Sequence, residues 1–139
     1  MNYENLMNIA ADMRTKSYAP YSKFHVGAAL LAKSGKIYTG CNVENSSFGA
    51  TNCAERTAFF KAVSEGERDF SAIAIVGGPV EKEGDFSKIT LAPPCGICRQ
   101  VMREFCKPDF EIILYNEQKG IEIHTLKELL PLDFGPENL

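Results

Sequence analysis

Short apolar runs of strand length alternate with helical patterns along the whole chain, and this alternation most constrains its fold. Residues 24–32 and 36–43 are largely apolar and are separated by Ser34-Gly35, so they predict a β-hairpin. Because polar residues rarely interrupt these runs, both strands are expected to be covered on both faces. Further strands are expected at residues 72–76, 111–116 and 121–124.

Helices are expected before and between these strands, at residues 3–16, 53–66, 95–106 and 126–130. The first should end before Pro20, because the residue that precedes a proline is disfavoured in the α region. Asn52 is the expected N-cap of the second helix. Strands that alternate with helices in a chain of this size predict an α/β fold, a three-layer α/β/α sandwich around a mixed central sheet.

Length and composition favour a single domain over residues 1–139, since two domains would each lack an adequate core. The net charge of −3 argues against a broad nucleic-acid-binding face, but a net charge does not exclude a local basic groove. No segment approaches the roughly 20 apolar residues that span a bilayer. The N-terminal residues lack the apolar stretch of a secretory signal, so a cytoplasmic location without membrane attachment is expected.

The chain contains five cysteines, an odd number that cannot pair completely within one monomer. Without an export signal, metal binding or catalysis is favoured over a disulfide framework. Two fragments, Cys53-Ala-Glu-Arg56 and Pro94-Cys-Gly-Ile-Cys98, each lie at an expected helix start. A C-x-x-C pair alone is also compatible with a redox dithiol, a structural zinc site or small buried side chains.

Together the two fragments match the signature of zinc deaminases. Cys53, Cys95 and Cys98 supply three zinc ligands and leave the fourth tetrahedral position for water, so one Zn²⁺ per subunit is expected. Glu55 occupies the position of the carboxylate that does not bind the metal. It should take a proton from the zinc-activated water, pass it to ring nitrogen N3 and later protonate the leaving ammonia. Arg56 either donates hydrogen bonds to the thiolates or is simply a solvated helix residue.

Four ordered motifs resemble the small homotetrameric cytidine deaminases: Tyr18–Leu30, Gly40–Asn45, Asn52–Arg56 and Pro94–Gln100. The resemblance covers nearly the whole chain and ends in Glu128-Leu-Leu-Pro131 and the following Phe134. The resemblance implies hydrolytic deamination of cytidine and deoxycytidine, with release of ammonia, in pyrimidine salvage. It also implies a homotetramer whose active sites are shared between subunits, acting on a small nucleoside rather than on a nucleic-acid polymer.

The same resemblance assigns substrate contacts. Asn42 and Glu44 resemble the pair that binds the ribose 3′-hydroxyl, and Phe24 resembles the aromatic residue that packs on the pyrimidine. Ala54 would present its backbone N–H to the base O2. Phe134 resembles a C-terminal aromatic residue that reaches into a neighbouring subunit's pocket.

Two features of the sequence depart from the family pattern. Phe48 stands where many members carry Tyr, so a hydroxyl contact at the sugar end of the substrate is missing. Residues 80–91 form a polar connection a few residues longer than usual, expected to be a surface insertion.

Three alternatives stay open. A deaminase of another cytosine-bearing molecule, such as blasticidin S, would keep the zinc chemistry, and Asn42 with Glu44 would distinguish it because they presuppose a ribose. A polynucleotide-editing deaminase would need phosphate contacts that the acidic balance does not favour. A non-catalytic zinc module would need a fourth protein ligand, which the motifs themselves do not contain.

Overall fold

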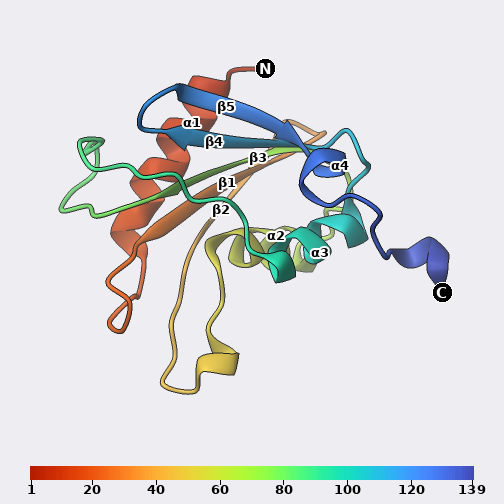
Figure 1. The fold of residues 1–139 in the computed structure, drawn as a ribbon, viewed down its shortest axis with the longest axis horizontal. Helices are drawn as coiled ribbons and strands as arrows, with labels where there is room; N and C mark the ends of the chain where they lie inside the picture. Colours follow the sequence, from red (N-terminus) through yellow and green to blue (C-terminus); the bar gives the residue numbers. More distant parts are fainter.

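The structure is a computed structural model that describes all of residues 1–139, and its centre is a mixed five-stranded sheet (Figure 1). The strand order is β2-β1-β3-β4-β5, with β3 and β4 parallel and the other neighbours antiparallel. The strands are β1 (Val26–Ala32), β2 (Ile37–Cys41), β3 (Phe70–Gly77), β4 (Glu111–Asn116) and β5 (Gly120–Thr125). The helices are α1 (Tyr3–Met13), α2 (Ala54–Ser64), α3 (Gly96–Phe105) and α4 (Leu126–Leu129).

Helices cover both faces of the sheet and confirm the predicted three-layer sandwich. Alternate residues of a strand point to opposite faces, so Leu30 joins the core beneath α2 and α3 while Ala29 joins the core beneath α1. None of the helices is both long and apolar enough to cross a membrane.

The predicted hairpin is confirmed, but β2 is not covered on both faces. Its residues alternate between buried and half-buried, whereas most of β1 is fully buried. The difference follows from position, because β2 is the edge strand and α1 lies mainly over β1 and β3.

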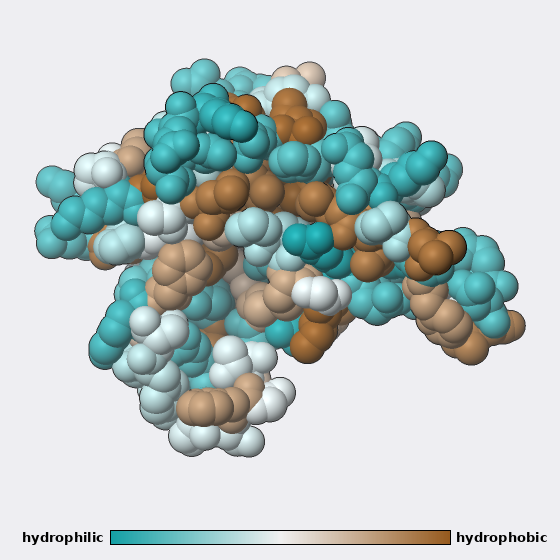
Figure 2. All heavy atoms as spheres, in the orientation of Figure 1, coloured by the Kyte–Doolittle hydropathy of each residue, from teal (hydrophilic) through white to brown (hydrophobic).

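The predicted N-cap of α2 is wrong by one residue. Cys53, rather than Asn52, is the last extended residue before the helix. The backbone of Asn52 instead pairs with Val43 through two hydrogen bonds of 2.9 Å. This pairing closes a lobe formed by residues 43–52, which stands away from the body of the molecule (yellow in Figure 1; lower left in Figure 2).

The connection between β3 and α3 contains no helix and no strand beyond one bridge between Gly77 and Thr90. Buried Arg14 anchors it by donating hydrogen bonds to the carbonyl oxygens of Pro79 and Asp85. The predicted surface insertion is therefore a loop, but one fixed to the end of α1.

Candidate metal and substrate site

The sheet topology gathers the functional residues at one edge. Since β1 runs antiparallel to both β2 and β3, the start of β1 lies beside the carboxyl ends of those two strands. Helices α2 and α3 follow β2 and β3 in the chain, so both helices begin at this edge. Carboxyl ends of strands are where open α/β sheets commonly bind ligands.

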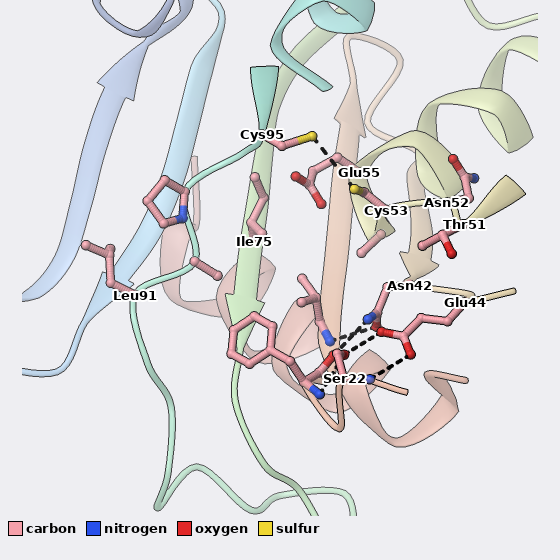
Figure 3. A pocket seen from close by; sticks show the side chains of 15 residues that line it. Ser22, Asn42, Glu44, Thr51, Asn52, Cys53, Glu55, Ile75, Leu91 and Cys95 are labelled. Atoms are coloured by element: carbon pink, nitrogen blue, oxygen red, sulfur yellow. Dashed lines mark hydrogen bonds between the residues drawn. The ribbon is translucent and has the colours of Figure 1, made fainter. Parts of the chain in front are cut away.

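A cavity of about 410 Å³ opens at this edge, within the range of small-molecule sites. Cys53, Cys95 and Glu55 lie at one end, which we call the cysteine end (Figure 3). Asn42, Glu44 and Ser22 lie at the other, which we call the polar end. The apolar part of the lining is contributed by Phe24, Val26, Ala54, Ile75, Leu91, Ala92 and Pro93.

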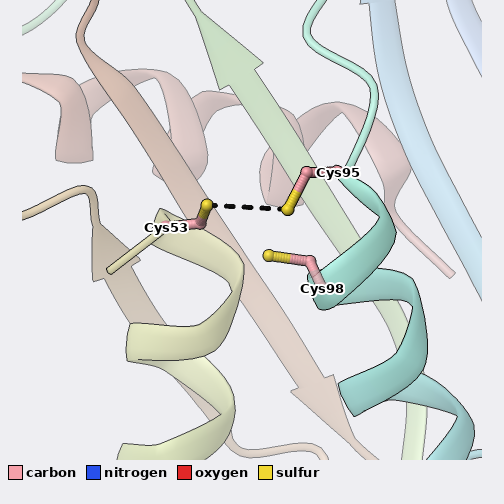
Figure 4. Close-up of side chains that lie close together, drawn as sticks. All are labelled: Cys53, Cys95 and Cys98. Atoms are coloured by element: carbon pink, nitrogen blue, oxygen red, sulfur yellow. Dashed lines mark hydrogen bonds between the residues drawn. The ribbon is translucent and has the colours of Figure 1, made fainter. Parts of the chain in front are cut away.

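The cysteine end contains a cluster of three thiols. The sulfur atoms of Cys53, Cys95 and Cys98 all lie within 4.8 Å of one another, and those of Cys53 and Cys95 are 3.8 Å apart (Figure 4). Cys53 and Cys95 are the N-caps of α2 and α3, and neither side chain makes a capping hydrogen bond. Their thiols are therefore free to face each other across the two helix starts.

This cluster fits a zinc ion. Zn–S bonds of about 2.3 Å in a tetrahedron place neighbouring sulfur atoms about 3.8 Å apart, as observed for Cys53 and Cys95. Three sulfur ligands leave one coordination position, and Cys95 borders the cavity from which a small molecule could reach it. Cys41 and Cys106, like both histidines, lie outside the cluster.

The thiols differ in acidity. Hydrogen bonds from Cys98 and then from Arg56 lower the pKa of Cys53 to about 5, although burial opposes this change. The same Cys53 contact, together with burial, raises the pKa of Cys98. The Arg56 Nη2 atom lies 3.3 Å from the Cys53 sulfur and donates to it. A thiolate is therefore already favoured at Cys53, the form that metal binding requires.

Glu55 is placed by the first turn of α2 with its carboxylate beside the thiols (Figure 3). Its side chain is almost wholly buried, with 5% exposed. Burial raises the pKa of Glu55 to about 7, and the nearby Cys53 charge adds to this effect. A carboxyl group with this pKa can accept and release a proton near neutral pH.

At the polar end, Asn42 is held by groups from two segments. Its side-chain oxygen accepts from the Val26 N–H at 2.9 Å and from the Ser17 hydroxyl at 2.5 Å. Its amide nitrogen donates to the Phe24 carbonyl at 2.8 Å. These contacts occupy the oxygen and fix the flip of the amide, which leaves one N–H available for a ligand.

Glu44 is held by the turn that precedes β1. The backbone N–H groups of Tyr21 and Ser22 donate to its Oε1 atom at 2.9 and 3.1 Å, and the Ser22 hydroxyl donates to Oε2. Chiefly the Ser22 hydrogen bonds lower the pKa of Glu44, so the side chain is an anionic acceptor. Sequence reasoning missed both Ser17 and Ser22, and the only available signal was the place of Ser22 within the Tyr18–Leu30 motif.

The expected contact residue Phe134 lies outside the cavity, and so does Phe48, the position that departs from the family pattern. Phe134 is 57% exposed on the C-terminal segment, where Gln100 donates to its carbonyl at 2.8 Å. Phe48, at the tip of the 43–52 lobe, is 78% exposed and contacts Tyr21 edge-on at 6.2 Å between ring centroids. The structure thus brings together the expected zinc ligands, Glu55, Ala54, Asn42, Glu44 and Phe24, but not Phe134.

Comparison with known proteins agrees with this geometry. The model of the cytidine and deoxycytidylate deaminase zinc-binding region matches residues 1–113. A cytidine deaminase of Sporosarcina psychrophila is 50% identical over 139 residues, which cover 100% of this chain and 96% of that protein. A blasticidin-S deaminase of Bacillus cereus is 35% identical over 129 residues, covering 93% and 89%.

Among solved structures, a cytidine deaminase from Burkholderia pseudomallei aligns with a TM-score of 0.84 and 46% identity. The alignment covers 96% of this chain and 100% of that one. The fold and the thiol cluster define a zinc-dependent hydrolase with a buried carboxylate. The chain belongs to the cytidine deaminase family.

Proposed function

We propose that this protein hydrolyses cytidine and deoxycytidine to uridine and deoxyuridine, with release of ammonia. The observation that carries the proposal is the cavity itself, which joins the thiols and buried Glu55 at one end to Asn42 and Glu44 at the other. A nucleoside has the matching arrangement, with a reactive pyrimidine at one end and a sugar at the other.

At the cysteine end, Cys53, Cys95 and Cys98 would hold the zinc ion, which supplies a Lewis acid that makes water nucleophilic at neutral pH. The water oxygen forms a bond to pyrimidine C4. Glu55 takes up the proton released from the water and delivers it to N3. The second water proton passes through Glu55 to the amino group. The bond between C4 and the amino nitrogen then breaks, ammonia leaves and C4 becomes a carbonyl.

The base is positioned by residues between the two ends. Ala54 is fully buried at the start of α2, where the first N–H groups of a helix lack intrahelical partners. Its N–H is the proposed donor to the base O2. Phe24 lines the same cavity with 40% of its surface exposed, and the proposed contact with the pyrimidine would cover this ring.

The sugar hydroxyl is matched at the polar end by one donor and one acceptor. Asn42 retains a single N–H, and Glu44 retains acceptor capacity on its carboxylate. A ribose 3′-hydroxyl both accepts and donates, so it can accept from Asn42 and donate to Glu44. This complementarity favours a nucleoside over a cytosine-bearing molecule that lacks a hydroxyl at this position.

We further infer that the chain acts as one domain over residues 1–139 in a homotetramer, with Phe134 of each subunit completing a neighbour's pocket. The exposure of the Phe134 ring on a segment held by Gln100 supports this inference. Five free cysteines support a reducing, cytoplasmic location. The conversion of a free nucleoside supports a role in pyrimidine salvage.

Ammonia release tests the proposal, with cytidine, deoxycytidine and blasticidin S compared at equal concentration on the zinc-loaded protein. Faster release from the two nucleosides is expected. Preference for blasticidin S would replace the nucleoside assignment, and no release from any of the three would favour a non-catalytic zinc protein.

A further inference from the structure

The turn before β1 concentrates three hydrogen-bond donors on the single carboxylate of Glu44. Two are the backbone N–H groups of Tyr21 and Ser22, and the third is the Ser22 hydroxyl. Lys23, the next residue, has a φ of 62°, a left-handed conformation that costs a non-glycine residue roughly 1–2 kcal/mol. This conformation turns the chain between Ser22 and Phe24, the residue whose backbone N–H contacts the Ser22 hydroxyl.

The direction of the Ser22 hydroxyl is fixed by a second contact. Its oxygen accepts a hydrogen bond of 3.0 Å from the Phe24 backbone N–H. Because one lone pair is engaged in this way, the hydroxyl hydrogen is directed to the Oε2 atom of Glu44. Ser22 therefore links the backbone of Phe24, whose ring lines the cavity, to Glu44 at the polar end.

The hydrogen bond from Ser22 leaves the Glu44 carboxylate with a single free acceptor position. An ionised carboxylate offers about four acceptor positions. Two on Oε1 are taken by the backbone of residues 21 and 22, and one on Oε2 is taken by the Ser22 hydroxyl. One acceptor position is left, on Oε2, and its direction is set by the bond from Ser22.

We propose that Ser22 is a positioning residue that aims the remaining acceptor of Glu44 at the sugar hydroxyl of the nucleoside, and so determines selectivity for a 3′-hydroxyl. This inference rests on the proposed function, which places that hydroxyl between Asn42 and Glu44. Ser22 itself need not touch the reacting atoms, because Glu55 and the thiols lie at the other end of the cavity (Figure 3).

The test compares cytidine with 3′-deoxycytidine, which lacks the hydroxyl, by the ratio of their kcat/KM values. Ser22→Ala should lower the preference for cytidine roughly tenfold, because a charge-assisted hydrogen bond that orients the acceptor is lost. The loss should come from KM on cytidine, with kcat and the efficiency on 3′-deoxycytidine nearly unchanged. Ser22→Thr keeps the hydroxyl and should retain most of the preference. Ser34→Ala, in the exposed β1–β2 turn, is the matched control.

The variant Glu44→Ala distinguishes the positioning role of Ser22 from the assignment of the ribose site. If Glu44→Ala removes the preference, and Ser22→Ala lowers it in the otherwise unchanged protein but has little further effect in the double variant, the positioning role is supported. If Glu44→Ala removes the preference but Ser22→Ala leaves it intact, the inference about Ser22 is overturned and the ribose assignment stands. If neither change alters the preference, both the ribose assignment and this inference are wrong.

Discussion

The two ends of the cavity are built in different ways. At the cysteine end, Cys98 and Glu55 are buried, with 1% and 5% of their surfaces exposed, and both lie in the first turns of helices. At the polar end, Glu44 and Ser22 lie in loops and make their contacts close to the surface. One end is held by regular structure and the other by hydrogen bonds between loops.

In the proposed function, catalysis takes place at the cysteine end and the sugar is recognised at the polar end. Burial at the cysteine end changes the acidity of Glu55, which proton transfer needs. The polar end instead presents one donor and one acceptor with fixed directions. Changes at the cysteine end should therefore abolish turnover, whereas changes at the polar end should alter KM and substrate preference.

The largest effect is expected at the thiol cluster. Cys98→Ala should remove bound zinc and lower turnover by at least about 10³-fold, since a catalytic metal contributes several kcal/mol. Metal analysis and an ammonia assay measure the two effects. Cys106→Ala is the matched control, because Cys106 is a buried thiol that caps the other end of α3, outside the cluster. Equal losses in both variants would mean that packing, not metal binding, explains the result.

A smaller effect is expected when the sugar is removed. Two hydrogen bonds, one of them to a carboxylate, contribute about 2–4 kcal/mol, so free cytosine should be deaminated about 30- to 1,000-fold less efficiently than cytidine. Steady-state kinetics on the two compounds give the ratio. Comparable efficiencies would show that Asn42 and Glu44 do not bind a ribose.

Arg56 should have an intermediate role at the cysteine end. Arg56→Ala removes a donor to the Cys53 sulfur and should weaken zinc affinity or turnover about 10- to 100-fold. Competition with a chelator measures the affinity. Arg68→Ala serves as control, because exposed Arg68 follows the same helix and bonds only to carbonyl oxygens. If zinc affinity and turnover were unchanged in Arg56→Ala, the hydrogen bond from Arg56 to Cys53 would not contribute to the metal site.

The smallest effect is expected outside the cavity. Phe134→Ala should raise KM for cytidine about 2- to 13-fold through a lost aromatic contact worth about 0.5–1.5 kcal/mol, with kcat nearly unchanged. Phe86→Ala, a partly exposed ring on the β3–α3 connection, is the control. If KM does not change although the protein is tetrameric, Phe134 does not complete a neighbouring pocket.

The sequence predicted the layers and the positions of the strands and helices because apolar periodicity is a local signal. It also placed the proposed zinc ligands at helix starts, since Cys53 and the Cys95–Cys98 pair precede or begin helical patterns. The N-cap of α2 was assigned to the wrong residue because Asn52 pairs with Val43, which lies in a separate segment. Such a pairing leaves no local pattern in the sequence.

The contacts that sequence reasoning could not supply are those between distant segments. Ser17 reaches Asn42 across 25 positions, and Arg14 reaches Pro79 across 65. Single serines and arginines carry no distinctive spacing, so their roles become visible only when the fold brings the segments together. The prediction that β2 is covered on both faces was wrong for a related reason. The residue pattern of one strand does not reveal strand order, and β2 lies at the edge of the sheet.

The central claim is that Glu55 transfers protons beside a zinc ion that it does not bind. The most direct measurement is zinc content together with ammonia release from cytidine for the wild type and Glu55→Gln, with Glu65→Gln at the exposed end of α2 as control. We expect Glu55→Gln to retain zinc while turnover falls by about 10²–10⁴-fold or more. Turnover close to that of the wild type in the zinc-loaded variant would contradict the account.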